Sequence, residues 1–297
     1  MGDTPKELII LLGPTATGKT GAAIELAKAW HTAVISADSR QCFREINIGA
    51  AKPTPTQLSQ VQHYFINSHS IFDKVDAAIF AALAERWVSE IFERSDHAVM
   101  VGGTGMYIKA FCDGLDEIPA VDLQVRNQIR EDYARFGMDW LRGEIQRVDP
   151  AFALLGEVQN PQRVMRALEV KQSTGQSILS FRTAPKKQHP FQIRMLGIEL
   201  TKEELHRNIN ARVDQMMEHG LLAEASSLAP YRKLNALQTV GYSELFSYID
   251  GAISLSQAVE DIKRNTRLYA KRQLTWFRND PRVEWKQPGE IKKVMES

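Results

Sequence analysis

The fold of this chain is decided by residues 7–20, which read ELIILLGPTATGKT. The first part of this stretch is almost wholly apolar, as expected of a buried parallel strand. Helix-forming residues predominate from Lys19 onward, so we predict that a helix begins there. Between the strand and the helix, residues 13–20 match the complete phosphate-loop pattern, in which Gly13 and Gly18 are followed by a lysine and a threonine.

The phosphate loop predicts a binding site for a diphosphate. Backbone N–H groups and the N-terminus of the following helix attract phosphate groups. Lys19 adds a positive charge, and the hydroxyl of Thr20 is placed to bind Mg²⁺, the cofactor that we expect. The predicted diphosphate site comprises Gly13, Pro14, Thr15, Ala16, Thr17, Gly18, Lys19 and Thr20.

Strands and helices continue to alternate beyond this loop. A β-rich run covers residues 33–36, an amphipathic helix is predicted for residues 76–93, and residues 97–101 form another apolar strand. Such alternation is typical of an α/β protein with a parallel sheet. We therefore predict a sheet like that of the P-loop NTPases, with helices on both faces.

The alternation is interrupted in the middle of the chain. Between residues 119 and 190 the strand pattern disappears, and amphipathic segments rich in arginine predict an inserted all-helical domain. A strand pattern returns at residues 192–200, and a capping box at Thr201 predicts a helix that closes near Gly220. The predicted parts are residues 1–118, the first part of the phosphate-loop core; 119–190, the inserted domain; and 191–297, the rest of the core with a basic C-terminal helix.

Composition excludes several classes of protein. Of 297 residues, 43% are hydrophobic and 25% are charged, which excludes a disordered, collagen-like or disulfide-rich chain. The first residues lack the pattern of a signal peptide, and no apolar run approaches the ~20 residues of a membrane span. We expect a cytoplasmic protein with no membrane partner. Cys42 and Cys112 are too few and too far apart for a zinc site, so we interpret both as packing residues.

Positive charge is concentrated near the C-terminus, although the net charge of the chain is only +1. Between residues 262 and 286 the basic residues far outnumber the acids, Asp280 and Glu284. On a helix, Arg264, Arg267 and Lys271 fall on one face, which would suit a phosphate backbone. A solvated charged face remains the alternative.

Two further polar residues follow predicted strands. Asp38 comes just after the second strand, and Thr104 lies in the Gly-Gly-Thr-Gly segment after the third. Because the carboxyl ends of parallel strands meet at one edge, both residues should lie near the phosphate loop. Asp38 is a candidate catalytic residue; the alternatives are that it caps the next helix or holds magnesium through water. Neither strand ends in the acid that an ATP-hydrolysing site would need.

Taken together, these segments resemble the tRNA dimethylallyltransferase family, also called tRNA isopentenyl transferases, over nearly the whole chain. The resemblance rests on residues 13–20 (GPTATGKT), 36–41 (SADSRQ), 48–53 (IGAAKP), 101–105 (VGGTG) with Tyr107, 160–170 (NPQRVMRALEV), 241–242 (GY) and 271–278 (KRQLTWFR). It implies transfer of a dimethylallyl group from its diphosphate to the N6 amine of the adenosine 3′ to the tRNA anticodon.

The resemblance also implies roles for individual residues. Asp38 would accept the proton from the amine, Thr104 would place the diphosphate or the adenine, and Arg212 would neutralise the leaving pyrophosphate. The partners would be dimethylallyl diphosphate and the anticodon stem-loop of tRNA, and we expect a monomer. The implied tRNA contacts are Asp38, Ser39, Arg40, Gln41, Thr104, Arg126, Gln162, Arg163, Val164, Met165, Arg166, Gly241, Lys271, Arg272 and Arg278.

Four positions depart from the family's pattern. Gln62 replaces a histidine, Glu45 a glycine and Ala50 a threonine, and an arginine that is usual at Asn208 is absent, although Arg207 adjoins it. These departures concern the contacts to diphosphate and tRNA, not the reaction.

Two other functions fit parts of the sequence. A small-molecule kinase would use the same loop with ATP, so nucleotide binding stays open, but it has no use for the basic tail. A non-catalytic tRNA-binding module would keep the basic surfaces but would not need Asp38 and Thr104 beside the loop.

Overall fold

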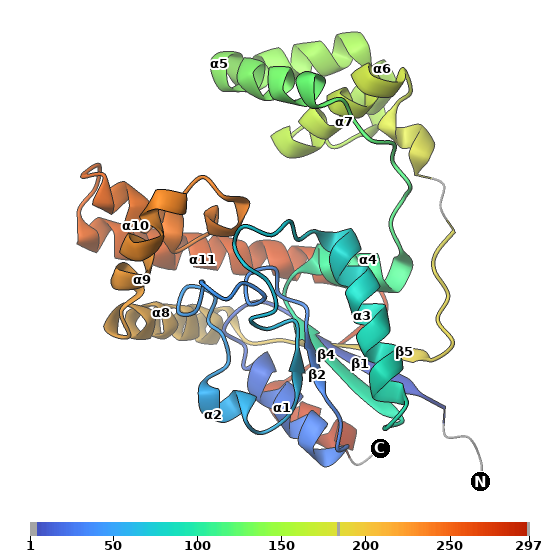
Figure 1. The fold of residues 1–297 in the computed structure, drawn as a ribbon, viewed down its shortest axis with the longest axis vertical. Helices are drawn as coiled ribbons and strands as arrows, with labels where there is room; N and C mark the ends of the chain where they lie inside the picture. Colours follow the sequence, from blue (N-terminus) through green and yellow to red (C-terminus); the bar gives the residue numbers. More distant parts are fainter. Residues whose placement is uncertain (1–4, 183–184, 296–297) are drawn as a thin grey trace. The chain divides into compact units, whose positions relative to one another are not determined.

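The computed structural model describes residues 5–182 and 185–295, and a parallel sheet lies at its centre (Figure 1). The six strands are ordered β3-β2-β4-β1-β5-β6, and every neighbouring pair is parallel. The strands are β1 (Glu7–Leu12), β2 (Val34–Ser36), β3 (His63–Tyr64), β4 (His97–Gly102), β5 (Gln192–Ile198) and β6 (Val283–Lys286). The predicted α/β class with a parallel sheet is therefore confirmed.

Helices cover both faces of the sheet, as predicted (Figure 1). Alternate residues of β1 enter two separate cores because successive side chains of a strand point to opposite faces. Leu8 and Ile10 pack with α3 (Ala77–Phe92) and α4 (Gly105–Asp113). Ile9 and Leu11 pack with α1 (Lys19–Ala29) and with η4 (Pro288–Met295). The fully apolar β1 is thus explained by burial on both sides.

Local capping signals fix the starts of two of these helices. Asp76 caps α3, since its Oδ1 accepts hydrogen bonds from Ala78 N at 3.1 Å and Ile79 N at 3.0 Å. The predicted capping box opens α8 (Lys202–Glu218): Thr201 Oγ1 accepts from Glu204 N at 3.2 Å, and Glu204 Oε2 accepts from Thr201 N at 3.0 Å.

The segment after α8 is helical until β6 and carries much of the wall of the candidate site. Its elements are α9 (Leu221–Leu228), η2 (Ala229–Tyr231), η3 (Asn235–Leu237), α10 (Tyr242–Ile249) and the long α11 (Leu255–Arg278). The short α2 (Pro55–Leu58) lies between β2 and β3. Phe277 is buried in the large core beside the sheet, and Trp276 packs against the same core.

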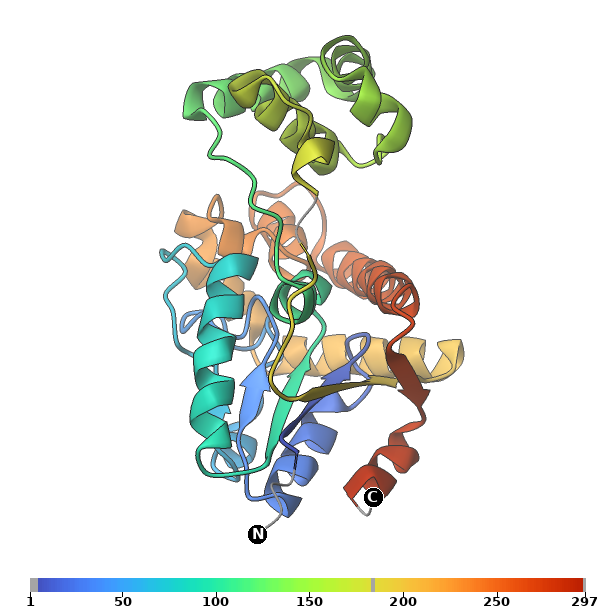
Figure 2. The same cartoon turned by 90° about the vertical axis from the view of Figure 1, so that its right-hand side faces the viewer.

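The chain divides into two compact units (Figure 2). The first comprises Met1–Cys112 and Gln188–Ser297, and the second comprises Asp113–Lys187. The sequence analysis placed an inserted domain at residues 119–190. The chain segments that enter and leave the second unit meet each other, because Lys187 N donates to Asp113 O at 3.1 Å.

The second unit has its own helical core. It contains α5 (Leu123–Val148), α6 (Pro150–Leu155), α7 (Pro161–Thr174) and η1 (Ile178–Phe181), and no strand is assigned to its described residues. Ile129, Leu141, Phe152 and Leu168 are buried together in this core. Gly137 interrupts α5 with a φ of 75°, so α5 consists of two helical segments.

Cys42 and Cys112 are both buried in the large core beside the sheet, which confirms them as packing residues. Among the residues that the structure describes, none of the helices has the length and apolar character needed to cross a membrane.

Candidate active site

The phosphate loop leaves the carboxyl end of β1 and leads directly into α1. Gly13 and Gly18 have positive φ values of 135° and 84°, which a residue with a side chain rarely adopts. The ammonium group of Lys19 folds back onto the loop, where it donates to the carbonyl oxygen of Pro14 and, at 3.4 Å, to Thr17 Oγ1. The loop is thus closed around its own lysine.

Lys19 lies in an environment that disfavours its charge. Desolvation and the nearby positive charge of Arg212 lower the pKa of Lys19 to about 7, while the charge of Asp38 acts in the opposite direction. Desolvation also lowers the pKa of Arg212, again against the effect of Asp38. These two cations and one carboxylate therefore form one electrostatically coupled group, and an added anion would relieve its excess positive charge.

Helix α8 supports the phosphate loop from one side. An Arg212 terminal nitrogen (Nη1) donates to Thr15 Oγ1 at 3.1 Å, and Asn208 Nδ2 donates to Ala16 O at 3.2 Å. Residues four apart on a helix share a face, so both side chains reach the same loop. Asn208, at a position where the family usually has arginine, thus holds the peptide next to Ala16, whose φ is +65°. The neighbouring Arg207 is exposed; hydrogen bonds from Thr201 lower the pKa of Glu204, and the charge of Arg207 adds to this effect.

Asp38 and Thr104 come together at the same edge of the sheet. Asp38 Oδ1 accepts hydrogen bonds from Arg40 N at 2.8 Å and Gln41 N at 3.3 Å, whereas Oδ2 has no partner among the described residues. Thr104 Oγ1 accepts from Ser39 N at 3.0 Å. Asp38 therefore orders the turn after β2 with one oxygen, and its other oxygen is available to a ligand.

Gln41 holds this part of the chain together. Its Oε1 accepts from Ser36 Oγ at 2.9 Å, and its Nε2 donates to Ala50 O at 3.4 Å and Ala51 O at 3.3 Å. The Gln41 side chain, an implied tRNA contact, is thus engaged within the protein. Arg40 Nε is buried without a hydrogen-bond partner in the described part of the chain.

A cavity of about 620 Å³ opens beside the phosphate loop, a size that fits a small-molecule site. Thr15, Asp38 and Arg212 all contribute to its lining. Its charged and polar lining also includes Ser39, Arg40, Glu244, Asn265 and Arg272, and its apolar lining includes Val213, Met216, Leu221, Val240 and Ile262. A polar group and a hydrocarbon group of one ligand could therefore both be accommodated.

Glu224 on α9 fixes one wall of this cavity. Its carboxylate accepts backbone hydrogen bonds from Asn47 at 3.0 Å, Ile48 at 2.9 Å and Gly49 at 2.9 Å, and a fourth from the hydroxyl of Tyr242 at 2.5 Å. Burial and the adjacent Glu224 raise the pKa of Tyr242. A side chain at Gly49 would collide with the Tyr242 ring. No motif in the sequence indicates Glu224, although its partner Tyr242 belongs to the Gly-Tyr pair on which the family resemblance rests in part.

A second carboxylate organises the opposite part of the wall. Glu244 is 8% exposed, and its two oxygens accept from Gly241 N at 2.8 Å and Asn265 Nδ2 at 2.6 Å. Gly241, an implied tRNA contact, lines the cavity through its backbone.

Gln273 joins the phosphate loop to the segment after β4. This residue of α11 is 7% exposed; its Oε1 accepts from Thr15 N at 3.0 Å and its Nε2 donates to Gly103 O at 2.9 Å. A Cβ atom at Gly103 would collide with this amide. Gln273 lies within the stretch KRQLTWFR, and the one sign of its bridging role in the sequence is a polar residue among the apolar positions of a helix.

The basic face of α11 is more varied than its sequence suggests. Arg264 pairs with Asp261 at 2.9 Å, Arg267 donates to Asn210 Oδ1 at 2.7 Å, and Arg278 pairs with Glu199. Lys271 and Arg272 are exposed. Three of the cations on α11 that were predicted to bind phosphate therefore already have a side-chain partner. Among the described residues, no carboxylate or amide side chain pairs with Lys271 or Arg272.

The implied tRNA contacts of the second unit differ in exposure. Gln162 is exposed, and Arg163 is exposed and pairs with Glu157. Val164 and Met165 are 0% and 5% exposed within the helical core, so their side chains pack and are not available to RNA. Contact of these two residues with tRNA stays a prediction and would have to involve the backbone.

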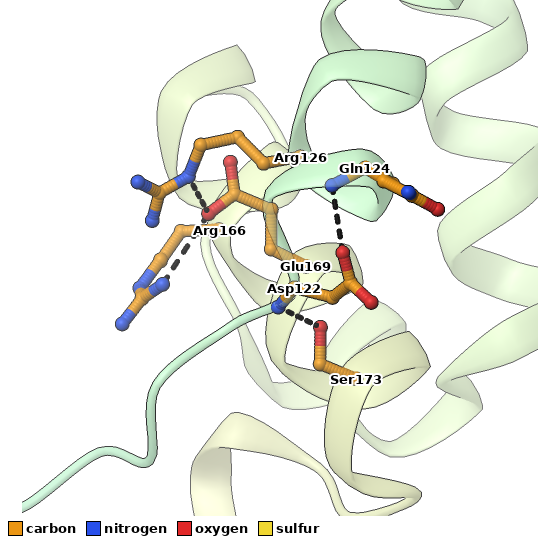
Figure 3. A network of polar contacts seen from close by, with 6 residues as sticks. All are labelled: Asp122, Gln124, Arg126, Arg166, Glu169 and Ser173. Atoms are coloured by element: carbon orange, nitrogen blue, oxygen red, sulfur yellow. Dashed lines mark hydrogen bonds and ion pairs between the residues drawn. The ribbon is translucent and has the colours of Figure 1, made fainter.

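Arg126 and Arg166 share a single partner, the carboxylate of Glu169 (Figure 3).

No cluster of three or more metal-binding side chains occurs among residues 5–182 and 185–295.

Replacing Gln273 by leucine should destabilise the protein by about 1–3 kcal/mol, because Thr15 N and Gly103 O would lose their hydrogen-bond partner inside the protein. Urea unfolding of the full chain measures this loss. Gln257→Leu, an exposed glutamine of the same helix, is the matched control and should change stability by less than about 0.5 kcal/mol. Equal effects of the two variants would contradict the bridging role.

Comparison with known proteins places this chain in a family. The family model described as IPP transferase matches residues 41–280. The chain is 43% identical over 289 residues to tRNA dimethylallyltransferase 1 of Bacteroides thetaiotaomicron, which covers 97% of this chain and 94% of that protein. It is 42% identical over 289 residues to tRNA dimethylallyltransferase of Cytophaga hutchinsonii, covering 97% and 95%.

Solved structures agree with this result. The tRNA isopentenylpyrophosphate transferase of Bacillus halodurans has a TM-score of 0.71 and 35% identity, covering 98% of this chain and 95% of that one. A eukaryotic dimethylallyltransferase acting on tRNA, 23% identical, shares the fold with a TM-score of 0.76 and covers 95% and 74%. The extent of the match and the identity to these relatives show that this chain belongs to the IPP transferase family.

Proposed function

We propose that this chain transfers a dimethylallyl group from dimethylallyl diphosphate to the N6 amine of the adenosine 3′ to the anticodon of tRNA, and releases pyrophosphate. The observation that carries the proposal is that Thr15 of the phosphate loop lines one cavity of about 620 Å³ together with Arg212 and Asp38, whose Oδ2 has no hydrogen-bond partner among the described residues. The names of the relatives support the same reaction class.

The phosphate loop would hold the diphosphate. Backbone N–H groups at the start of α1, the Lys19 ammonium and the Arg212 guanidinium supply positive charge where negative charge develops as the allylic C–O bond breaks. This charge is in place before the reaction, so little reorganisation is needed when pyrophosphate leaves.

Thr20 fits a role as ligand of Mg²⁺. It lies in the first turn of α1, is half-buried, and its hydroxyl has no hydrogen-bond partner among the described residues. Magnesium in proteins is commonly held by one or two side chains together with phosphate oxygens of the substrate, so Thr20 and the diphosphate form a suitable donor set. The ion would add positive charge to the diphosphate.

Asp38 would act as the general base. The adenine amine is a weak nucleophile because its lone pair is delocalised into the ring, so removal of its proton must accompany bond formation. The N6–C bond forms, the allylic C–O bond breaks with its electrons going to pyrophosphate, and Asp38 Oδ2 takes the amine proton. The hydrogen bonds from Arg40 N and Gln41 N to Oδ1 hold the carboxylate in place.

The lining of the cavity favours a prenyl donor over ATP. Apolar side chains of α8, α9 and α11, among them Val213, Leu221 and Ile262, provide a hydrocarbon surface for the dimethylallyl group. A small-molecule kinase would use the same loop and carboxylate, so the donor is the point that an assay must decide.

The tRNA would be bound by exposed cations and by the edge of the cavity. Lys271 and Arg272 on α11 are exposed, and Arg126, Arg163 and Arg166 bring further positive charge to the second unit. Because a loop adenosine can be splayed out of the anticodon loop, its base could enter the cavity while the cations hold the phosphates.

A direct assay should show prenyl transfer. The protein and Mg²⁺ are incubated with an unmodified tRNA transcript and either dimethylallyl diphosphate or ATP, and the nucleosides are weighed by mass spectrometry. We expect one adenosine to gain the mass of a dimethylallyl group, and no ADP to form. ADP formation would support the kinase, and tRNA binding without either product would support the binding module.

Asp38→Asn should lower the single-turnover rate by about 10²–10⁴ while leaving substrate affinities nearly unchanged, because the amide keeps the size of the carboxylate but cannot accept the proton. Asp96→Asn, an exposed residue with the same change in charge, should react at the rate of the unaltered protein. A normal chemical step in Asp38→Asn would remove Asp38 from the mechanism.

Pyrophosphate binding should take up a proton above neutral pH. The pKa of Lys19 is about 7 in the free protein, and a bound anion raises it, so Lys19 gains a proton on binding at pH 8 but is already mostly protonated at pH 6. Calorimetry in buffers of different ionisation enthalpy measures this uptake. In Lys19→Arg the side chain stays charged, so the uptake should be smaller by up to one proton at pH 8. Equal uptake in both proteins would contradict the lowered pKa.

A further inference from the structure

The second unit contains a buried carboxylate placed between two arginines. Glu169 on α7 is 5% exposed. Its Oε2 accepts from Arg126 Nε on α5 at 3.2 Å and from a terminal nitrogen (Nη1) of Arg166 on α7 at 3.3 Å. The two arginine side chains are about one-third exposed, at 32% and 34%. One buried carboxylate thus accepts hydrogen bonds from two partly exposed arginines.

Among the described residues, most donors of both guanidinium groups have no hydrogen-bond partner. Arg126 uses its Nε and keeps its two terminal nitrogens, whereas Arg166 uses one terminal nitrogen and keeps the other. Figure 3 shows both guanidinium groups on the same side of the helices, extending beyond the carboxylate. Guanidinium forks match the oxygens of a phosphate, so two adjacent forks form a suitable receptor for one phosphate group.

Glu169 makes this juxtaposition possible. Both hydrogen bonds reach the same oxygen, so the two cations lie close together, and their repulsion must be offset by the carboxylate between them. The three side chains carry a net charge of about +1 at neutral pH. A buried ion pair is often no more stabilising than an apolar replacement, so fold stability gives little reason for this arrangement.

The backbone under Arg126 is also fixed. Asp122 caps the start of α5, where its Oδ1 accepts from Gln124 N at 2.7 Å. Asp122 N donates to Ser173 Oγ on α7 at 3.0 Å, which joins the start of α5 to the helix that carries Glu169 (Figure 3). Arg126, in the first turn of α5, is therefore held in register with Arg166.

We propose that Glu169 is a positioning residue that holds Arg126 and Arg166 as a two-arginine receptor for one phosphate of the tRNA backbone. The inference rests on the proposed function, because it takes tRNA as the ligand. The proposal gives an acidic residue a role in RNA binding. Judged by its charge alone, Glu169 would be expected to repel RNA.

The sign of one charge change tests the proposal. Glu169→Gln adds one positive charge to the second unit, so attraction by net charge alone would tighten tRNA binding. If Glu169 positions the arginines, binding should instead weaken about tenfold, as expected for loss of a charge-assisted contact. The slope of log affinity against log salt should fall by about 0.7–0.9, the value for one phosphate contact.

Asp139→Asn is the matched control. Asp139 lies in the same unit, is fully exposed, and is 3.8 Å from Arg142. The substitution makes the same charge change without touching Arg126 or Arg166, so tRNA affinity should stay unchanged or rise. Filter binding of an unmodified tRNA transcript over a range of salt concentrations compares the two variants with the unaltered protein.

Steady-state kinetics separates positioning from loss of structure. For Glu169→Gln we expect KM for tRNA to rise while kcat and KM for dimethylallyl diphosphate stay unchanged. Should this variant unfold in circular dichroism, Arg166→Lys provides the second test, because lysine keeps the charge and loses the fork. It should also weaken binding about tenfold. If Glu169→Gln folds, the effect of Arg166→Lys should be much smaller in the Glu169→Gln background.

The outcomes distinguish the two proposals. If the unaltered protein binds tRNA and Glu169→Gln binds it equally well or more tightly with the same salt slope, the positioning role is wrong and the proposed function stands. If Glu169→Gln unfolds and Arg166→Lys binds normally, the role is likewise wrong. If the unaltered protein neither binds nor modifies tRNA, the proposed function fails as well.

Discussion

Parallel pairing of β1 with β4 on one side and β5 on the other is the constraint on which the site depends. The register aligns Leu12 of β1 with Gly102 of β4 and Gly197 of β5, so the strands end together. The phosphate loop follows β1, Thr104 follows β4, and the Asp38 turn follows β2, which pairs with β4 and aligns Ser36 with Val101, so all three share one edge of the sheet. Residues that are far apart in the sequence can act on one ligand because of this register.

The charges at that edge are balanced for an anion. Lys19 and Arg212 lie in a desolvated region, which lowers the pKa of both groups, and the charge of Arg212 lowers the pKa of Lys19 further. Asp38 offsets only part of this positive charge. In the proposed reaction a diphosphate would supply the missing negative charge, and the same groups would favour its departure as pyrophosphate, so binding and catalysis would use one electrostatic arrangement.

Carboxylates and amides that never enter the proposed chemistry keep this arrangement in shape. Glu224 holds the loop at residues 47–49 through three backbone N–H groups, and Gln273 joins Thr15 to Gly103. In the second unit, Glu169 does the same for Arg126 and Arg166. In each case a buried or half-buried acceptor orders groups that would otherwise repel one another or remain mobile, which is how a site gains preorganisation.

The sequence by itself determined the features that depend on near neighbours: the strand, phosphate loop and helix of residues 7–20, the parallel alternation, and the capping box of α8. These follow from local hydrophobic periodicity and local hydrogen bonds, which a linear pattern records. Only the tertiary structure decided that Gln273 reaches Thr15, 258 residues away, that Asn208 supports the loop, and which arginines are already paired. Such contacts depend on which helix faces meet, and no local pattern contains that information.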